Sequence, residues 1–272
     1  MYNQRQQQKI IPKRPLSEAE TRRYFSPRQF SIWTWIILLL GLLLITMSYN
    51  LLQSWIVFSG GMIVLLGSIV HIILTFTGRI SDKQYDSWVE DQAEAMYYEA
   101  LQTLGLYESD LSDPVQCIHS FVLPGSRIAE AYPTQEMHVK RGKDDQLRYS
   151  VHVYTYFFFT RNSLAIFKGD INAWNHSEYD EKNYTFMRRY QHIMDVVIYK
   201  FQDTVRIEDK LFQYTIEQCH LELTNGRTIP LSAALRARRR DRQRNVIKSL
   251  LPETGSESTL RDIRTLLFSK TY

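Results

Sequence analysis

Two long apolar runs near the N-terminus constrain this chain more than any other feature. Phe30 to Tyr49 and Trp55 to Phe76 are separated by a short segment, and no Asp, Glu, Lys or Arg occurs between Phe30 and Thr77. Each run is about 20 residues long, which is enough for a helix to cross a hydrocarbon core of about 30 Å. The two runs therefore predict a transmembrane helical hairpin over residues 30–77.

Basic residues on both sides of the hairpin predict its orientation. Arg22, Arg23 and Arg28 precede it, Arg79 and Lys83 follow it, and the connecting segment carries no basic residue. Lys and Arg concentrate in cytoplasmic segments next to membrane spans. We therefore expect a multi-pass protein of the inner (plasma) membrane, in integral contact with membrane lipids and with both termini in the cytoplasm.

Small residues in the apolar runs predict a close helix–helix contact. In the second run, Gly60 and Gly67 are seven residues apart, and so are Gly61 and Ser68, so each pair shares one helix face. Small side chains let neighbouring helices approach closely, here near Gly41 of the first run. The alternative is that these glycines have no packing role, since glycine is common in membrane helices.

The segments that flank the hairpin differ in charge. Residues 1–29 have seven basic and two acidic residues, a net charge of +5, and their polar composition predicts a disordered tail. Residues 79–113 have two basic and nine acidic residues, a net charge of −7. Apolar positions at helical spacing over 80–105 predict an amphipathic stalk helix that packs on a soluble domain or on a second copy, so a homo-oligomer is expected.

Beyond residue 117 the apolar period changes from helical to about two, which predicts a β-rich cytoplasmic domain over 117–250. Seven strands are expected, near 117–123, 135–140, 147–158, 163–168, 193–202, 214–223 and 227–231. Residues 172–190 show no clear period and are expected to form a long loop. A helix is predicted over 231–250, followed by an extension (251–272) with a short helix near 259–268.

The segment Tyr156 to Phe167 resembles the strand–TxxxL–strand hairpin of bacterial membrane-attached domains of the pleckstrin-homology-like (PH-like) family. Leu221 to Leu231 is similar to the last hairpin of that family, before its closing helix, so the resemblance covers residues 135–250. It implies a seven-stranded antiparallel β-barrel and a role in binding or scaffolding. The expected fold is therefore a membrane α-helical hairpin with two transmembrane helices, an amphipathic stalk helix, and an α+β soluble domain with a PH-like barrel and C-terminal helices.

Two groups of basic residues are candidates for binding anionic lipid or an acidic protein partner. Lys140, Arg141, Lys143 and Arg148 fall near the basic pattern of phosphoinositide-binding PH domains, although Gln146 replaces one basic residue of it. The second group is six arginines on the predicted helix: Arg236, Arg238, Arg239, Arg240, Arg242 and Arg244. The alternative is a solvated helix surface. Nucleic acid is not an expected partner, because no aromatic residue interleaves these arginines.

Residues with catalytic or metal-binding potential are scattered. No nucleophile elbow, phosphate loop or HExxH pair occurs, and two cysteines form neither a metal cluster nor a disulfide framework. No enzyme activity, metal or cofactor is therefore expected. The predicted function is that of a membrane-anchored, non-enzymatic interaction or scaffold protein. The alternative, from a likeness of architecture, is a two-span membrane effector of a bacterial defence system whose β-rich domain senses a ligand.

Overall fold

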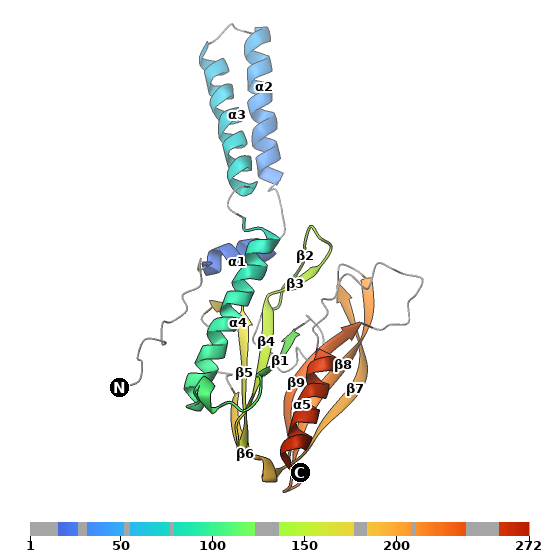
Figure 1. Ribbon diagram of the computed structural model, residues 1–272. Helices are drawn as coiled ribbons and strands as arrows, with labels where there is room; N and C mark the ends of the chain where they lie inside the picture. The colour runs from blue at the N-terminus through green and yellow to red at the C-terminus, as the bar shows by residue number, and fades with distance from the viewer. Residues whose placement is uncertain are drawn as a thin grey trace, which may run out of the picture. The chain divides into compact units, whose positions relative to one another are not determined.

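A computed structural model of the chain describes residues 16–26, 32–51, 55–76, 79–122, 136–176, 184–207, 210–237 and 256–271. These residues form two compact units, one of 22–81 and one that contains 82–272 together with the first 21 residues. Figure 1 labels the helices and strands of both. The candidate sites lie in the larger unit, which we call the β-domain.

The main sheet of the β-domain is antiparallel, in the order β1-β4-β5-β6. Its strands are β1 (Gln116–Phe121), β4 (Val151–Phe159), β5 (Ser163–Asn172) and β6 (Tyr184–Arg189). Nearly every residue of β4 and β5 is buried, because these central strands are covered on both faces. This explains why bulky side chains occupy both faces of the β4 sequence.

Two smaller antiparallel sheets complete the β-domain. Strands β7 (Ile193–Ile207), β8 (Lys210–Leu223) and β9 (Thr228–Ala237) form one sheet in that order. Strands β2 (Val139–Arg141) and β3 (Leu147–Tyr149) form a short hairpin. The 3₁₀ turn η4 (Tyr190–His192) links β6 to β7, so the chain passes from the main sheet into the second sheet at one end of the domain.

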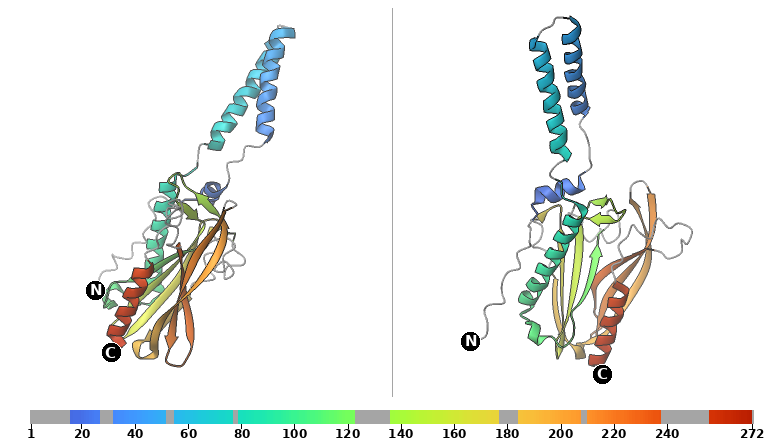
Figure 2. Two further views of the ribbon diagram at one scale, coloured as in Figure 1. Left: turned by 90° about the vertical axis from the view of Figure 1, so that its right-hand side faces the viewer. Right: turned by 45° about the horizontal axis from the view of Figure 1, so that its top comes forward.

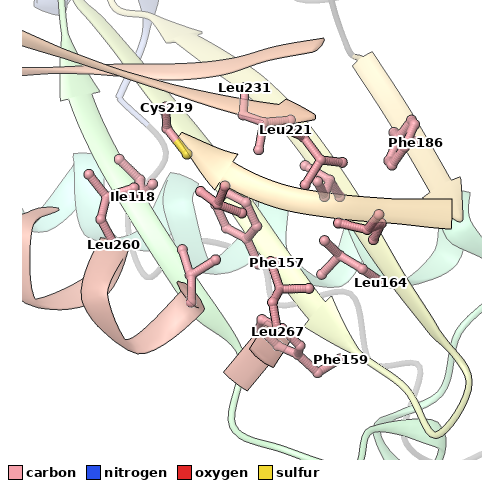
Figure 3. Packing of buried hydrophobic residues seen from close by; sticks show 14 of the residues in the cluster. Ile118, Phe157, Phe159, Leu164, Phe186, Cys219, Leu221, Leu231, Leu260 and Leu267 are labelled. Carbon is pink, nitrogen blue, oxygen red and sulfur yellow. The ribbon is translucent and has the colours of Figure 1, made fainter. Parts of the chain in front are cut away.

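The core lies between the main sheet and the β7-β8-β9 sheet. Phe157 of β4, Leu164 of β5 and Leu221 of β8 meet there, and each is completely buried. Helix α5 (Ser256–Thr271) adds Leu260, Ile263 and Leu267 to the same cluster, and Figure 3 labels Leu260 and Leu267. The apolar spacing of α5 follows from this packing, since these three positions repeat at helical intervals on one face.

Helix α4 (Asp82–Leu104) covers the other face of the main sheet. The three views agree that α4 and the β7-β8-β9 sheet lie on opposite sides of β4 and β5 (Figures 1 and 2). Its buried side chains are Tyr85, Trp88, Val89, Met96, Ala100 and Leu101. Gly105 ends the helix with φ of +65°, a conformation that glycine adopts without strain.

The expected seven-stranded PH-like barrel is wrong. The described residues contain nine strands, and their three antiparallel sheets do not close into a barrel. Strand β6, which sequence analysis assigned to a long loop, extends the main sheet beyond β5. The helix predicted over 231–250 is also wrong for 231–237, because these residues continue β9 and pair with β8.

The smaller unit contains α2 (Ile32–Leu51) and α3 (Trp55–Phe76), which pack against each other. They approach most closely at two glycines. A Cβ atom on Gly61 would lie 2.8 Å from Ile45 Cγ1, and one on Gly41 would lie 3.2 Å from the backbone nitrogen of Leu65. Ser68 is buried and donates a hydrogen bond to the carbonyl of Val64 (2.8 Å). Gly60 and Gly67 are not at this contact, since a Cβ atom on either would meet nothing within 4 Å.

The expected membrane hairpin must be corrected. In the part of the chain that the structure describes, no helix is long and apolar enough to cross a membrane. This finding contradicts the two predicted membrane spans and the predicted multi-pass location in the inner membrane.

The N-terminal segment is more ordered than its composition indicates. Residues 18–25, within the tail expected to be disordered, form α1 (Glu18–Phe25). A reciprocal capping arrangement begins this helix: the Ser17 hydroxyl accepts a hydrogen bond from the Glu20 N–H (3.3 Å), and the Glu20 carboxylate accepts one from the Ser17 N–H (2.9 Å). Polar residues in this spacing thus stabilise a helix start.

Candidate functional site

Arg148, one of the basic residues predicted to bind an anion, is buried in an ion-pair network. Only 7% of its side chain is exposed. Its guanidinium donates to both carboxylate oxygens of Asp86 on α4 (2.8 and 2.7 Å) and to both of Asp144 in the β2–β3 turn (2.7 and 2.8 Å). These hydrogen bonds lower the pKa of Asp144 to about 2. Arg148 therefore joins the β2–β3 hairpin to α4, and its donors are occupied.

The rest of the β2–β3 hairpin carries little unbalanced positive charge. Arg141 pairs with Asp145 (3.0 Å), and the backbone N–H of the exposed Lys143 donates to Asp82 of α4 (2.8 Å). Lys140 lies in β2 opposite Arg148. The four predicted basic residues thus lie beside four carboxylates, those of Asp82, Asp86, Asp144 and Asp145. The structure brings the predicted group together but places it in a nearly neutral environment.

The predicted six-arginine helix falls largely outside the described residues. Arg236 lies in β9, where it pairs with Thr215 of β8. Arg238, Arg239, Arg240, Arg242 and Arg244 lie outside the part of the chain that the structure describes.

A basic surface that sequence analysis missed lies where β6 gives way to β7. Two backbone hydrogen bonds bring separate segments together there, and a third closes one of the turns. The N–H of Tyr190 in η4 donates to the carbonyl of Asn162 in the β4–β5 turn (3.3 Å). The N–H of Thr224 in the β8–β9 turn donates to the carbonyl of His192 (3.1 Å), and that turn is closed by a bond from the Leu223 N–H to Arg227 (2.9 Å).

Each of these segments contributes exposed arginine. We call the resulting surface the basic end and define it by Arg161, Arg188, Arg189 and Arg227. All four side chains are exposed, and among the described residues none of them makes an ion pair. Arg188 lies over the ring of Phe186, 5.2 Å from its centroid, and donates to the carbonyl of Met187 (2.8 Å). Four exposed guanidinium groups without an ion pair among the described residues make this surface able to bind an anion.

Local sequence explains why the three segments keep these positions. The Thr160 hydroxyl accepts from the Ser163 N–H (3.0 Å), which fixes the β4–β5 turn. Tyr190 is buried beneath it, and its hydroxyl donates to the carbonyl of Thr160 (2.8 Å). In the β8–β9 turn, Gly226 takes φ of +75°, as the Asn-Gly pair of a tight hairpin requires. The arginines are therefore held on a rigid base.

Neighbouring charges at this end of the domain are already paired. Arg264 of α5 contacts Asp195 of β7 (3.2 Å), and Lys270 contacts Asp113 (2.8 Å). The hydrogen bond from Lys270 lowers the pKa of Asp113. These pairs neutralise Asp195 and Asp113, two acids at this end of the domain.

The signal that predicts the basic end is present but weak. Tyr184 and Phe186 precede Arg188 and Arg189 and are two residues apart, but only Phe186 is buried, and both lie within the segment assigned to a loop. Recognising β6 would have placed both arginines at the end of an edge strand. Their proximity to Arg161 and Arg227, however, depends on tertiary contacts that no local pattern encodes.

A second cluster of polar side chains lies beneath α4. The rings of His119 (β1) and His152 (β4) are hydrogen-bonded, with His119 Nε2 3.0 Å from His152 Nδ1. His152 Nε2 lies 3.1 Å from the hydroxyl of Tyr85, which donates to the carbonyl of Tyr149. Because a carbonyl can only accept, each group donates to the next: His119 to His152, His152 to Tyr85, and Tyr85 to the carbonyl.

In this chain of hydrogen bonds His152 is neutral, because its Nδ1 accepts a hydrogen bond from His119. Burial lowers the pKa of His119 to about 4 and that of His152 to about 3, the latter also because of the neighbouring His119. Nearby on β1, burial raises the pKa of the Cys117 thiol to about 12, far from a reactive thiolate. The cluster is thus suited to fixing α4 on the sheet. Among the described residues, no group of three His, Cys, Asp or Glu side chains could hold a metal ion.

Comparisons of the chain with protein-family models, with curated proteins and with solved structures gave no match. The resemblance to PH-like domains therefore stays a prediction from two short segments.

Proposed function

We propose that the β-domain is a non-enzymatic interaction module whose basic end binds a carboxylate-rich surface of a protein partner. The observation that carries this proposal is the gathering of Arg161, Arg188, Arg189 and Arg227 on three segments joined by backbone hydrogen bonds. None of these side chains has an acidic partner among the described residues.

The type of residue at the basic end favours protein carboxylates. All four cations are arginines, and the planar guanidinium can donate two parallel hydrogen bonds to one carboxylate. Met187 and Met194 lie on the same segments, with exposed fractions of 38% and 66%. Arginine and methionine are both enriched in protein–protein interfaces relative to the remaining surface. Bidentate charge pairs next to adaptable apolar side chains suit a protein partner.

The arrangement at the basic end also explains why an anionic partner should bind there rather than at the β2–β3 hairpin. An arginine that already satisfies two carboxylates, as Arg148 does, offers no donors to a partner. The arginines of the basic end do not have to break an existing ion pair in order to bind a partner. An anionic ligand should therefore bind at the basic end.

The test is binding of a fluorescein-labelled peptide of ten glutamates to the full chain, followed by fluorescence anisotropy. R188E/R189E should weaken binding about tenfold, because two attractive contacts become repulsive, each change being modest at an exposed site. The control K83E/K143E changes the net charge equally, at exposed positions outside the basic end, and should change the affinity less than about twofold. Equal losses in the two variants would refute the proposal.

Vesicles containing phosphatidylglycerol provide the second arm of the experiment. One outcome would overturn the protein-partner proposal in favour of an anionic lipid surface. In that outcome the chain binds the vesicles but not the glutamate peptide, and R188E/R189E loses the vesicle binding. Binding to the peptide at low salt that weakens as salt is raised supports the proposal, since exposed charges are screened.

A further inference from the structure

An acidic surface on α4 is complementary to the basic end. Glu90, Asp91 and Glu94 occupy one side of the helix, and Tyr98 continues it one turn further. Glu90 and Glu94 are exposed, and Tyr98 is 42% exposed. We call these four residues the acidic face. The opposite side of α4, including Met96 and Ala100, is buried against the main sheet, so α4 is held with its carboxylates outward.

The carboxylates of the acidic face are available to a binding partner. Among the described residues, neither Glu90 nor Glu94 makes an ion pair. Asp86, one turn before Glu90, differs in this respect because it binds Arg148. The basic end and the acidic face are thus two exposed surfaces of the described β-domain that carry opposite charge.

We infer that the partner of the basic end is a second copy of this chain, which presents its acidic face. This inference rests on the proposed function, because it names the partner of the same site. In the proposed contact, the arginines of the basic end of one copy bind Glu90 and Glu94 of the next copy. Aromatic and apolar side chains occur on both surfaces, Tyr98 on one and Met194 on the other, and such residues often dominate interface energetics.

The symmetry of this contact has a consequence for the assembly. The two surfaces are different, so the contact is head-to-tail, and a pair of copies still has one free basic end and one free acidic face. Head-to-tail contacts produce closed rings or open chains rather than simple two-fold dimers. The weight-average mass should therefore rise progressively with concentration, unless a ring closes.

The experiment is sedimentation velocity on the full chain at increasing protein concentration, in low and high salt. Wild-type protein should associate at 50 mM NaCl and dissociate at 500 mM, because screened surface charges lose most of their attraction. Association through the outward apolar side chains of α2 and α3, such as Ile63 (71% exposed), would persist in high salt. Salt-independent association would overturn the inference.

Reversing the charges on each surface provides the decisive comparison. R188E/R189E should not self-associate, and neither should E90K/E94K. An equimolar mixture of the two should associate, because each variant then offers the other a complementary surface, and the variant with all four substitutions should associate by itself. E136K/D262K, which changes the net charge as much as E90K/E94K at other exposed positions, should behave like wild type.

These variants also separate the inference from the proposed function. E90K/E94K should bind the glutamate peptide as wild type does, since its basic end is intact. If the peptide binds but the mixture of variants does not associate, the second-copy inference is wrong and the basic end has another protein partner. If the peptide does not bind at all, both the proposed function and the inference are wrong.

Discussion

The ion-pair network at Arg148 allows a worked prediction of stability. Arg148→Met keeps most of the side-chain volume but removes hydrogen bonds of 2.7 to 2.8 Å to Asp86 and Asp144. Charge-assisted bonds contribute roughly 1.5 to 3 kcal/mol each, so a simple sum would exceed 6 kcal/mol. That sum is too large, because the two aspartates are 44% and 47% exposed and regain water when the arginine is lost.

We therefore expect the free energy of unfolding of Arg148→Met to fall by about 2 to 3 kcal/mol. This is less than the loss for a pair that leaves a fully buried charge behind, which is about 3 to 5 kcal/mol. The measurement is urea unfolding of the full chain, followed by far-UV circular dichroism at pH 7. Gly142→Ala should destabilise the same region, because a Cβ atom there would overlap the Arg148 guanidinium.

Arg141→Met is the matched control. It removes the neighbouring ion pair with Asp145, whose side chains are 33% and 65% exposed, and should cost less than about 1 kcal/mol. If Arg148→Met and Arg141→Met lose the same small amount of stability, the network does not join the hairpin to α4 as we describe. A loss of glutamate-peptide affinity in Arg148→Met, at unchanged stability, would also contradict this structural role.

Two further predictions concern other parts of the fold. The pKa values of His119 (about 4) and His152 (about 3) lie below the usual 6.5, so the unfolded chain binds more protons as pH falls from 6.5 towards 4. The two histidines together should therefore lower the free energy of unfolding by about 5 kcal/mol between pH 6.5 and pH 4, at about 1.4 kcal/mol per pKa unit for each. His119→Gln should reduce the slope, and an unchanged slope would argue against a buried neutral pair. In the smaller unit, Gly61→Ala should destabilise by about 1 to 3 kcal/mol through overpacking against Ile45. Gly60→Ala, where nothing lies within 4 Å, should instead stabilise the helix by up to about 1 kcal/mol; thermal unfolding of both variants tests the opposite signs.

Sequence patterns predicted individual elements of this fold better than their arrangement. The strand starts near residues 117, 163 and 193 follow from the change to a period of two, and the Asn225-Gly226 hairpin follows from its turn chemistry. Strand β6 was missed because its residues are mostly exposed on an edge, so buried and exposed positions hardly alternate. Such an edge strand is determined by pairing with β5, which is a tertiary property.

The errors at the two ends of the β-domain have distinct causes. Residues 231–237 include Leu235 and Arg236, good helix formers, yet they continue β9 because pairing with β8 outweighs local propensity. The predicted barrel came from counting strands, which says nothing about whether sheets close. For the apolar runs, length and composition predicted membrane spans, whereas the described stretches contain no helix long and apolar enough to cross.

Candidate site residues were predictable by type but not by partner. Lys140, Arg141, Lys143 and Arg148 do lie together on one hairpin. Their sequence does not reveal that Asp82 and Asp86, some 60 residues earlier, lie beside them, since this depends on how α4 packs. Conversely, the arginines of the basic end are spread from residue 161 to residue 227, and only the fold gathers them.

Hydrogen–deuterium exchange of the full chain, with and without the glutamate peptide, tests the central claim most directly because it locates the site without any substitution. We predict slower exchange in peptides that cover 160–163, 189–193 and 223–228, the segments that carry or flank the basic end, and no change over 139–149. Protection confined to the β2–β3 hairpin, or unchanged exchange at all three segments under saturating peptide, would contradict the account.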